Sequence, residues 1–146
     1  MKYLITVLFV ANASFSYAAD TTPSSSGPAW QGEAQKEIKE KNYDGAVKTL
    51  LAANEPNSAD WNNLLGFAQR KKSPPDLNAA ERYYQAALKI DPKHKGALEY
   101  YGELLLMKNN LPGAEQMLAR LDKVCFFSCE EYRDLKEEIA KYKAKN

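Results

Sequence analysis

The sequence has no excess of charge of either sign and almost no histidine. Its 20 Lys and Arg residues are balanced by 19 Asp and Glu residues, and His94 is the single histidine among 146 residues. A nearly neutral chain offers no extended positive surface to a phosphate backbone, so nucleic-acid binding is not expected. His94 stands between Lys93 and Lys95, which suits neither a metal ligand nor a general base. We interpret it as a surface loop residue.

The sequence also lacks the motifs of the common enzyme classes. It contains no G-x-S-x-G nucleophile turn, no phosphate-binding loop and no zinc-ligand spacing. Its adjacent acidic pairs, Glu130 with Glu131 and Glu137 with Glu138, are expected to be solvated charges on a helix face. We therefore predict a protein that is not an enzyme and has no catalytic residue, no metal ligand and no cofactor.

No apolar run reaches the length of about 20 residues that a membrane-spanning helix needs. The run from Tyr3 to Ala11 follows a positive charge at Lys2 and precedes small residues at Ala18 and Ala19. That order is typical of a cleaved secretory signal. We predict a signal peptide over 1–19, a disordered Pro- and Ser-rich linker over 20–29, and export, with the bacterial periplasm as the expected compartment. Stable membrane insertion after cleavage is not expected.

Cysteine is scarce, with Cys125 and Cys129 the two in the chain. An even number in an exported chain favours one disulfide over a metal cluster. Four residues apart across a helix junction, the two come within disulfide reach, and the bond would fasten the last helix to the preceding repeat. The alternative is a periplasmic thiol-redox or copper-binding accessory protein that works through Cys125 and Cys129, although no histidine ligand or thioredoxin-like strand pattern lies nearby.

The chain does contain a helical pattern that repeats at a fixed spacing along the sequence. Ala46, Ala80 and Ala114 recur at a period of about 34 residues. Two further sets keep the same spacing: Leu50, Tyr84 and Leu118, and Tyr43, Leu77 and Leu111. A helix pair repeated in tandem lets neighbours bury the apolar faces that one pair leaves exposed.

These residues carry a resemblance to a known family. Between Leu77 and Pro92, the small, aromatic, small and helix-ending positions of a tetratricopeptide repeat are occupied by Ala80, Tyr84, Ala87 and Pro92. The chain from Trp30 to Val124 resembles three such repeats, and its ending C-F-F-S-C-E-E-Y is similar to the C-x-x-x-C-E-E-Y ending of small exported bacterial proteins of this family. The resemblance implies an all-α superhelix of three helix-turn-helix pairs.

Turn and cap signals divide this region. We predict a domain over 30–146, with repeats at about 30–57, 58–92 and 93–125 and a polar-faced capping helix over 128–145. Ser128 and Glu131 form a capping box at the start of that last helix. Helix caps are predicted at Asn42, Ser58, Asp76 and Asn110.

The resemblance implies that the first helix of each pair lines a concave groove that binds a peptide or a partner protein. The residues expected to face it are Gln31, Gln35, Asn63, Phe67, Arg70, Glu99, Tyr100 and Glu103. Their amide, aromatic and charged groups suit an extended peptide. The expected function is a non-catalytic interaction module or scaffold. Association into a homo-oligomer through the Trp30 end is left open.

Overall fold

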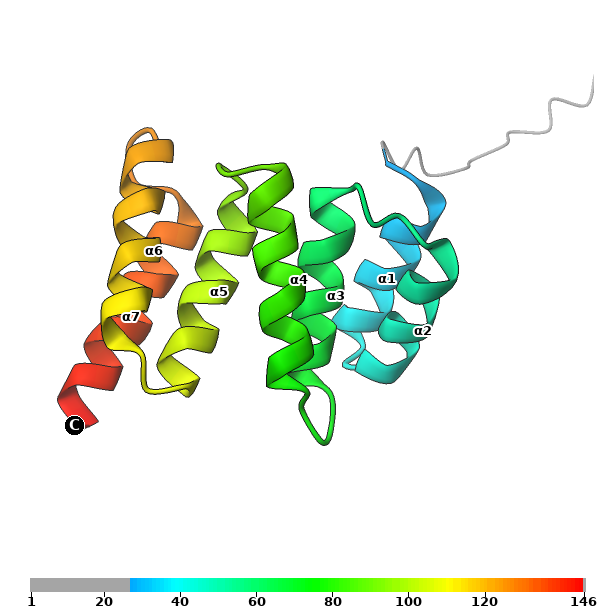
Figure 1. Cartoon of the computed structure of the whole chain (residues 1–146), viewed down its shortest axis with the longest axis horizontal. Coiled ribbons are helices and arrows are strands. Elements are labelled where there is room, and N and C mark those ends of the chain that lie inside the picture. Colours follow the sequence, from blue (N-terminus) through cyan, green and yellow to red (C-terminus); the bar gives the residue numbers. More distant parts are fainter. Residues whose placement is uncertain (1–26, 146) are drawn as a thin grey trace, which may run out of the picture.

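The computed structural model describes residues 27–145, which form seven α-helices stacked as antiparallel hairpins (Figure 1). The helices are α1 (Ala29–Lys39), α2 (Tyr43–Ala53), α3 (Ala59–Lys71), α4 (Leu77–Ile90), α5 (Lys95–Met107), α6 (Leu111–Val124) and α7 (Glu130–Lys145). The predicted all-α architecture of three helix pairs and a final helix is confirmed. The predicted signal peptide and most of the predicted linker lie outside the described residues. No helix within 27–145 is long and apolar enough to cross a membrane.

Short polar side chains start the helices where the sequence predicts. Each of four residues accepts a hydrogen bond from the backbone N–H three positions later: Asn42, Ser58, Asp76 and Asn110. His94 caps α5 in the same way, because its Nδ1 accepts from Ala97 N at 3.0 Å. Its Nε2 lies 2.9 Å from Asp60 Oδ1 in the preceding repeat. This corrects the interpretation of His94 as a surface loop residue: it begins a helix and joins two repeats.

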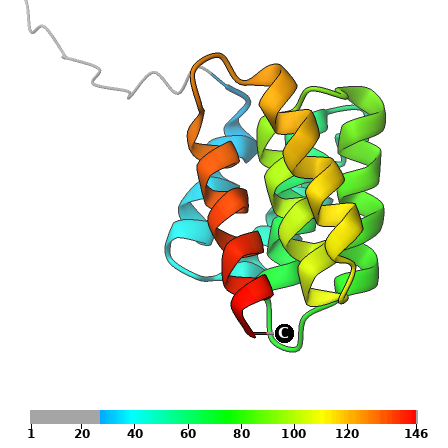
Figure 2. The ribbon, with the colours of Figure 1, turned by 90° about the vertical axis from the view of Figure 1, so that its left-hand side faces the viewer.

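The helices form an inner and an outer row. In the inner row, α1 lies against α3, α3 against α5 and α5 against α7, whereas in the described chain no Cα atoms of α2 and α4, or of α4 and α6, come within 8 Å of each other. Figure 2 views the stack from the α6–α7 end, with α7 (red) in one row and α6 (yellow to orange) in the other. Closer spacing in the inner row makes that side the concave one.

Two glycines allow neighbouring helices to approach closely. A Cβ atom on Gly66 would lie 2.8 Å from Tyr84 Cε1 and 3.2 Å from the Ala80 carbonyl oxygen, so a larger residue would not fit there. At Gly102, a Cβ atom would lie 2.5 Å from Leu135 Cδ2. The close neighbour of Gly102 therefore belongs to α7 and not to its hairpin partner α6. In consequence, α7 packs like the first helix of a further repeat.

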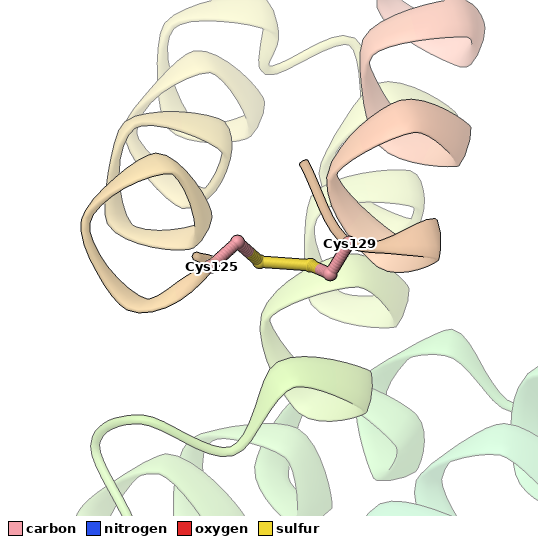
Figure 3. The surroundings of a disulfide bond; sticks show 2 residues. All are labelled: Cys125 and Cys129. Carbon is pink, nitrogen blue, oxygen red and sulfur yellow. A yellow bond between two sulfur atoms is a disulfide. The ribbon is translucent and has the colours of Figure 1, made fainter. Parts of the chain in front are cut away.

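The turn between α6 and α7 is closed by the predicted disulfide between Cys125 and Cys129, whose Cα atoms are 5.4 Å apart (Figure 3). The predicted capping box is wrong. Ser128 has a left-handed φ of 59°, and Arg133 N donates to the Cys129 carbonyl oxygen at 3.3 Å. Cys129 therefore occupies the N-cap position, and the helix starts two residues later than the predicted 128.

Replacing Cys125 and Cys129 together with alanine is expected to lower the free energy of unfolding by about 2 kcal/mol, because the open loop restores entropy to the unfolded chain. Urea denaturation of the oxidised protein and of the variant measures the difference. Wild-type protein reduced with dithiothreitol serves as the matched control and should unfold at the same urea concentration as the variant. Equal midpoints for oxidised and variant protein would contradict this role.

Candidate functional site

Two aromatic rings from neighbouring repeats meet on the inner row. Phe67 of α3 and Tyr100 of α5 have ring centroids 4.8 Å apart. Tyr43, at the start of α2, meets the Phe67 ring edge-on with centroids 6.3 Å apart. Phe67 and Tyr100 are each half-buried, so part of each ring remains open to solvent. We call Phe67 and Tyr100 the aromatic pair.

Arg70 lies against both rings of this pair and holds them in position. Its guanidinium carbon is 5.5 Å from the Phe67 ring centroid and 5.6 Å from that of Tyr100, a distance suited to cation–π attraction. The Arg70 side chain is 3% exposed and forms an ion pair with Glu103, which is 21% exposed. Burial alone would lower the pKa of Arg70. Tyr84 and Glu103 raise it by more than burial lowers it, so the guanidinium stays charged.

Glu99 is the most perturbed carboxyl in the groove. The residue is 7% exposed, and burial raises its pKa to about 8, with Glu103, Asp134 and Glu131 adding to the rise and Arg70 opposing it. At neutral pH this carboxyl therefore carries a proton. Burial, together with Glu99 and Glu103, also raises the pKa of the Tyr100 hydroxyl to about 12.

Helix α7 forms one wall of the groove. A recess of about 460 Å³ lies between α3, α5 and α7, lined by Arg70, Lys71, Glu103, Leu106, Met107, Glu138, Lys141, Tyr142 and Lys145. Glu138 lines this recess, and its side chain is 45% exposed. The interpretation of Glu137 and Glu138 as solvated charges therefore agrees with the structure, and Glu131 is partly exposed.

The structure brings together six of the eight residues predicted for the groove: Asn63, Phe67 and Arg70 of α3, and Glu99, Tyr100 and Glu103 of α5. Asn63 is buried, and its Nδ2 lies 3.1 Å from where a Cβ atom on Gly96 would be. Gln31 and Gln35 lie on α1, and none of the ring contacts or ion pairs described above includes them. Whether these residues contact a partner stays a prediction.

Sequence reasoning missed four residues of this site: Tyr43, Tyr84, Glu131 and Asp134. Tyr84 was recognised as a core position of the repeat, but its position beside Arg70 was not. The signal for Glu131 and Asp134 was the spacing to Leu135, because residues one and four positions before a buried leucine flank the same helix face. That signal has meaning only once α7 is known to pack on Gly102.

Part of the chain matches a family model, and its fold is similar to that of solved structures. Residues 76–139 match the family model described as tetratricopeptide repeat. The structure is similar to the type III secretion translocator chaperone SycD of Yersinia enterocolitica, with a TM-score of 0.68 and 18% identity over 80% of this chain and 82% of that one.

Two further structures of SycD are similar. One is a complex with a peptide of the translocator YopD, with a TM-score of 0.64 and 18% identity over 80% of this chain and 91% of that one. The other is an alternative dimer, with a TM-score of 0.65 and 18% identity over 80% of this chain and 90% of that one. No curated protein matches the sequence. At this identity the likeness shows the fold alone.

Proposed function

We propose that this chain is a tetratricopeptide repeat protein and a non-catalytic interaction module that holds an extended segment of a partner protein in its concave groove. The observation that carries the proposal is the aromatic pair. Phe67 and Tyr100 come from different repeats and meet on the inner row, and both residues are partly exposed to solvent. Rigid aromatic side chains of this kind supply contact area at low entropic cost.

The surroundings of the pair support a peptide as the ligand. Arg70 and Glu103 link the two repeats below the rings, so the surface that a ligand meets is already held in place. The recess beside α7 extends that surface along the stack. SycD, which has a similar fold, forms a complex with a peptide of the translocator YopD. We propose a peptide of a different, unidentified partner for this chain.

The compartment is also a proposal. The disulfide between Cys125 and Cys129 supports an exported protein in an oxidising space such as the bacterial periplasm. A copper-carrying role would require these cysteines to be reduced in that space, and a thiol-redox role would require the disulfide to open and re-form. Titration of free thiols in protein taken from its native compartment distinguishes the two functions, because reactive thiols would favour the carrier. Size measurement in solution tests the homo-oligomer.

Alanine at Phe67 or at Tyr100 is expected to weaken peptide binding at least tenfold, because truncation of a central aromatic contact removes apolar contact area. The probe is a set of peptides selected from a random twelve-residue display library on the purified oxidised protein, with affinity measured by fluorescence anisotropy. Circular dichroism checks that helicity is unchanged.

The matched control is Phe126→Ala, an aromatic truncation in the disulfide loop, where the residue is 93% exposed. It should leave the affinity unchanged. Selected peptides that bind both groove variants as tightly as the wild-type protein would show that the binding site lies elsewhere.

A further inference from the structure

Two acceptor groups on the inner row have no donor within residues 27–145. Glu99 is 7% exposed, and its carboxyl makes no hydrogen bond or ion pair with a described residue, while its oxygens still reach solvent. Asn63 is also 7% exposed, and its Oδ1 accepts no hydrogen bond from this part of the chain. Leaving a buried polar atom unpaired costs free energy, so such atoms mark places where a ligand can supply the missing partner.

The charges around Glu99 are mainly negative. Glu103 on α5, and Glu131 and Asp134 on α7, raise the pKa of Glu99 through their negative charges. Arg70 of α3 is the nearby positive group, but it already pairs with Glu103. The part of the groove between α5 and α7 therefore combines unpaired acceptors with negative charge that Arg70 does not balance.

The chemical complement of this place is a positively charged group that carries only donors. Lysine and arginine side chains meet that description, whereas a neutral peptide group would supply donors without the charge. A metal ion is not favoured, because no group of three or more His, Cys, Asp and Glu side chains in 27–145 is placed to hold one.

We propose that the groove recognises its partner through a lysine or arginine side chain that sits beside Glu99, between α5 and α7, while the neighbouring chain covers the aromatic pair. This inference rests on the proposed function and adds the chemical class of the ligand. Asp134 and Glu131 hold the positive charge from the α7 side, and the Glu99 carboxyl accepts its hydrogen bonds.

Binding of such a group is coupled to release of a proton. Because the pKa of free Glu99 is about 8, most of the protein holds a proton there at pH 7. A bound cation favours the ionised carboxylate and expels that proton. The affinity should therefore rise between pH 6 and pH 8, by at most about tenfold per pH unit for one proton.

The experiment uses the peptides selected from the random library and a second copy of each. In the copy, arginine is replaced with citrulline, which removes the charge and keeps the shape, or lysine with acetyllysine, which removes the charge and adds an acetyl group. We expect the selected peptides to share a basic residue and the neutral copies to bind the wild-type protein at least tenfold more weakly. On the Glu99→Gln variant, the difference between the two copies should shrink and the rise with pH should disappear. Glu55→Gln, which removes an exposed carboxylate far from the groove, is the control and should behave as wild type.

The outcomes separate the two proposals. Neutral copies that bind as well as the charged peptides, while binding still depends on Tyr100, would overturn the cationic partner and leave the groove as the site. Binding that depends on neither Phe67 nor Tyr100 would overturn the proposed function itself. A charge-dependent peptide whose affinity is the same for the Glu99→Gln and wild-type proteins would place the basic residue elsewhere and overturn the role of Glu99.

Discussion

Replacing Arg70 with alanine is expected to lower the free energy of unfolding by about 3 kcal/mol or more, as is typical when one partner of a buried ion pair is removed. The side chain is 3% exposed, so its loss opens space between Phe67, Tyr100 and Tyr84. It also leaves the Glu103 carboxylate without its partner. Urea denaturation followed by circular dichroism measures the change.

Two further variants show whether the pairing is responsible. Lys71→Ala removes an adjacent cation that also lies over Phe67, but Lys71 is exposed, and its loss should cost less than about 0.5 kcal/mol. The double variant Arg70→Met with Glu103→Gln removes both charges and fills part of the space, so it should recover some of the lost stability. An alanine variant at Arg70 as stable as the one at Lys71 would contradict the buried pair. If the loss is found, alanine at Arg70 is unsuitable as a test of binding, unlike alanine at Phe67 or Tyr100.

The fold could be predicted from the sequence because its determinants are local and periodic. Ala46, Ala80 and Ala114, which mark the period, are all completely buried. Cap residues lie within one turn of the helices that they start, so their spacing alone identified them. The start of α7 was placed too early because a disulfide, and not a capping box, sets the geometry of that turn.

The groove could be predicted only in part. Helical spacing placed Phe67 and Arg70 on one face, but it could not show that Arg70 is buried, since charged side chains usually remain exposed. The contribution of α7 depends on tertiary packing: Leu135 sits against Gly102, and this packing brings the charges of Glu131 and Asp134 near enough to raise the pKa of Glu99. From the sequence alone the same residues read as the polar face of a terminal helix.

Two polar contacts between neighbouring repeats follow the repeat period, although the Glu81–Lys108 ion pair does not. Arg70 pairs with Glu103, 33 residues later, and Asp60 meets His94, 34 residues later. Each pair therefore joins nearly equivalent positions in two successive repeats. Because one of these pairs supports the aromatic pair, the same contacts that hold the repeats together also shape the proposed binding surface.

Replacing Glu99 with glutamine is expected to stabilise the protein, and by more as the pH rises. The pKa of this carboxyl is about 8 in the folded protein against an ordinary value of 4.5. Between those values the folded state holds a proton that the unfolded state has released, so the wild-type protein loses stability as pH rises, by about 1.4 kcal/mol per unit at most. Glutamine does not ionise and avoids this loss.

The difference between the two proteins should be small at pH 5, grow to about 3 to 5 kcal/mol near pH 8 and then level off. Urea denaturation of both proteins at pH 5, 6, 7 and 8 measures it, and titrations that the two proteins share cancel in the comparison. Glu55→Gln removes an exposed carboxylate of the same charge and should give a difference that does not change with pH. Parallel curves for the Glu99→Gln and wild-type proteins would mean that Glu99 is ionised in the folded state, and the proton release expected on binding a cation would then be lost as well.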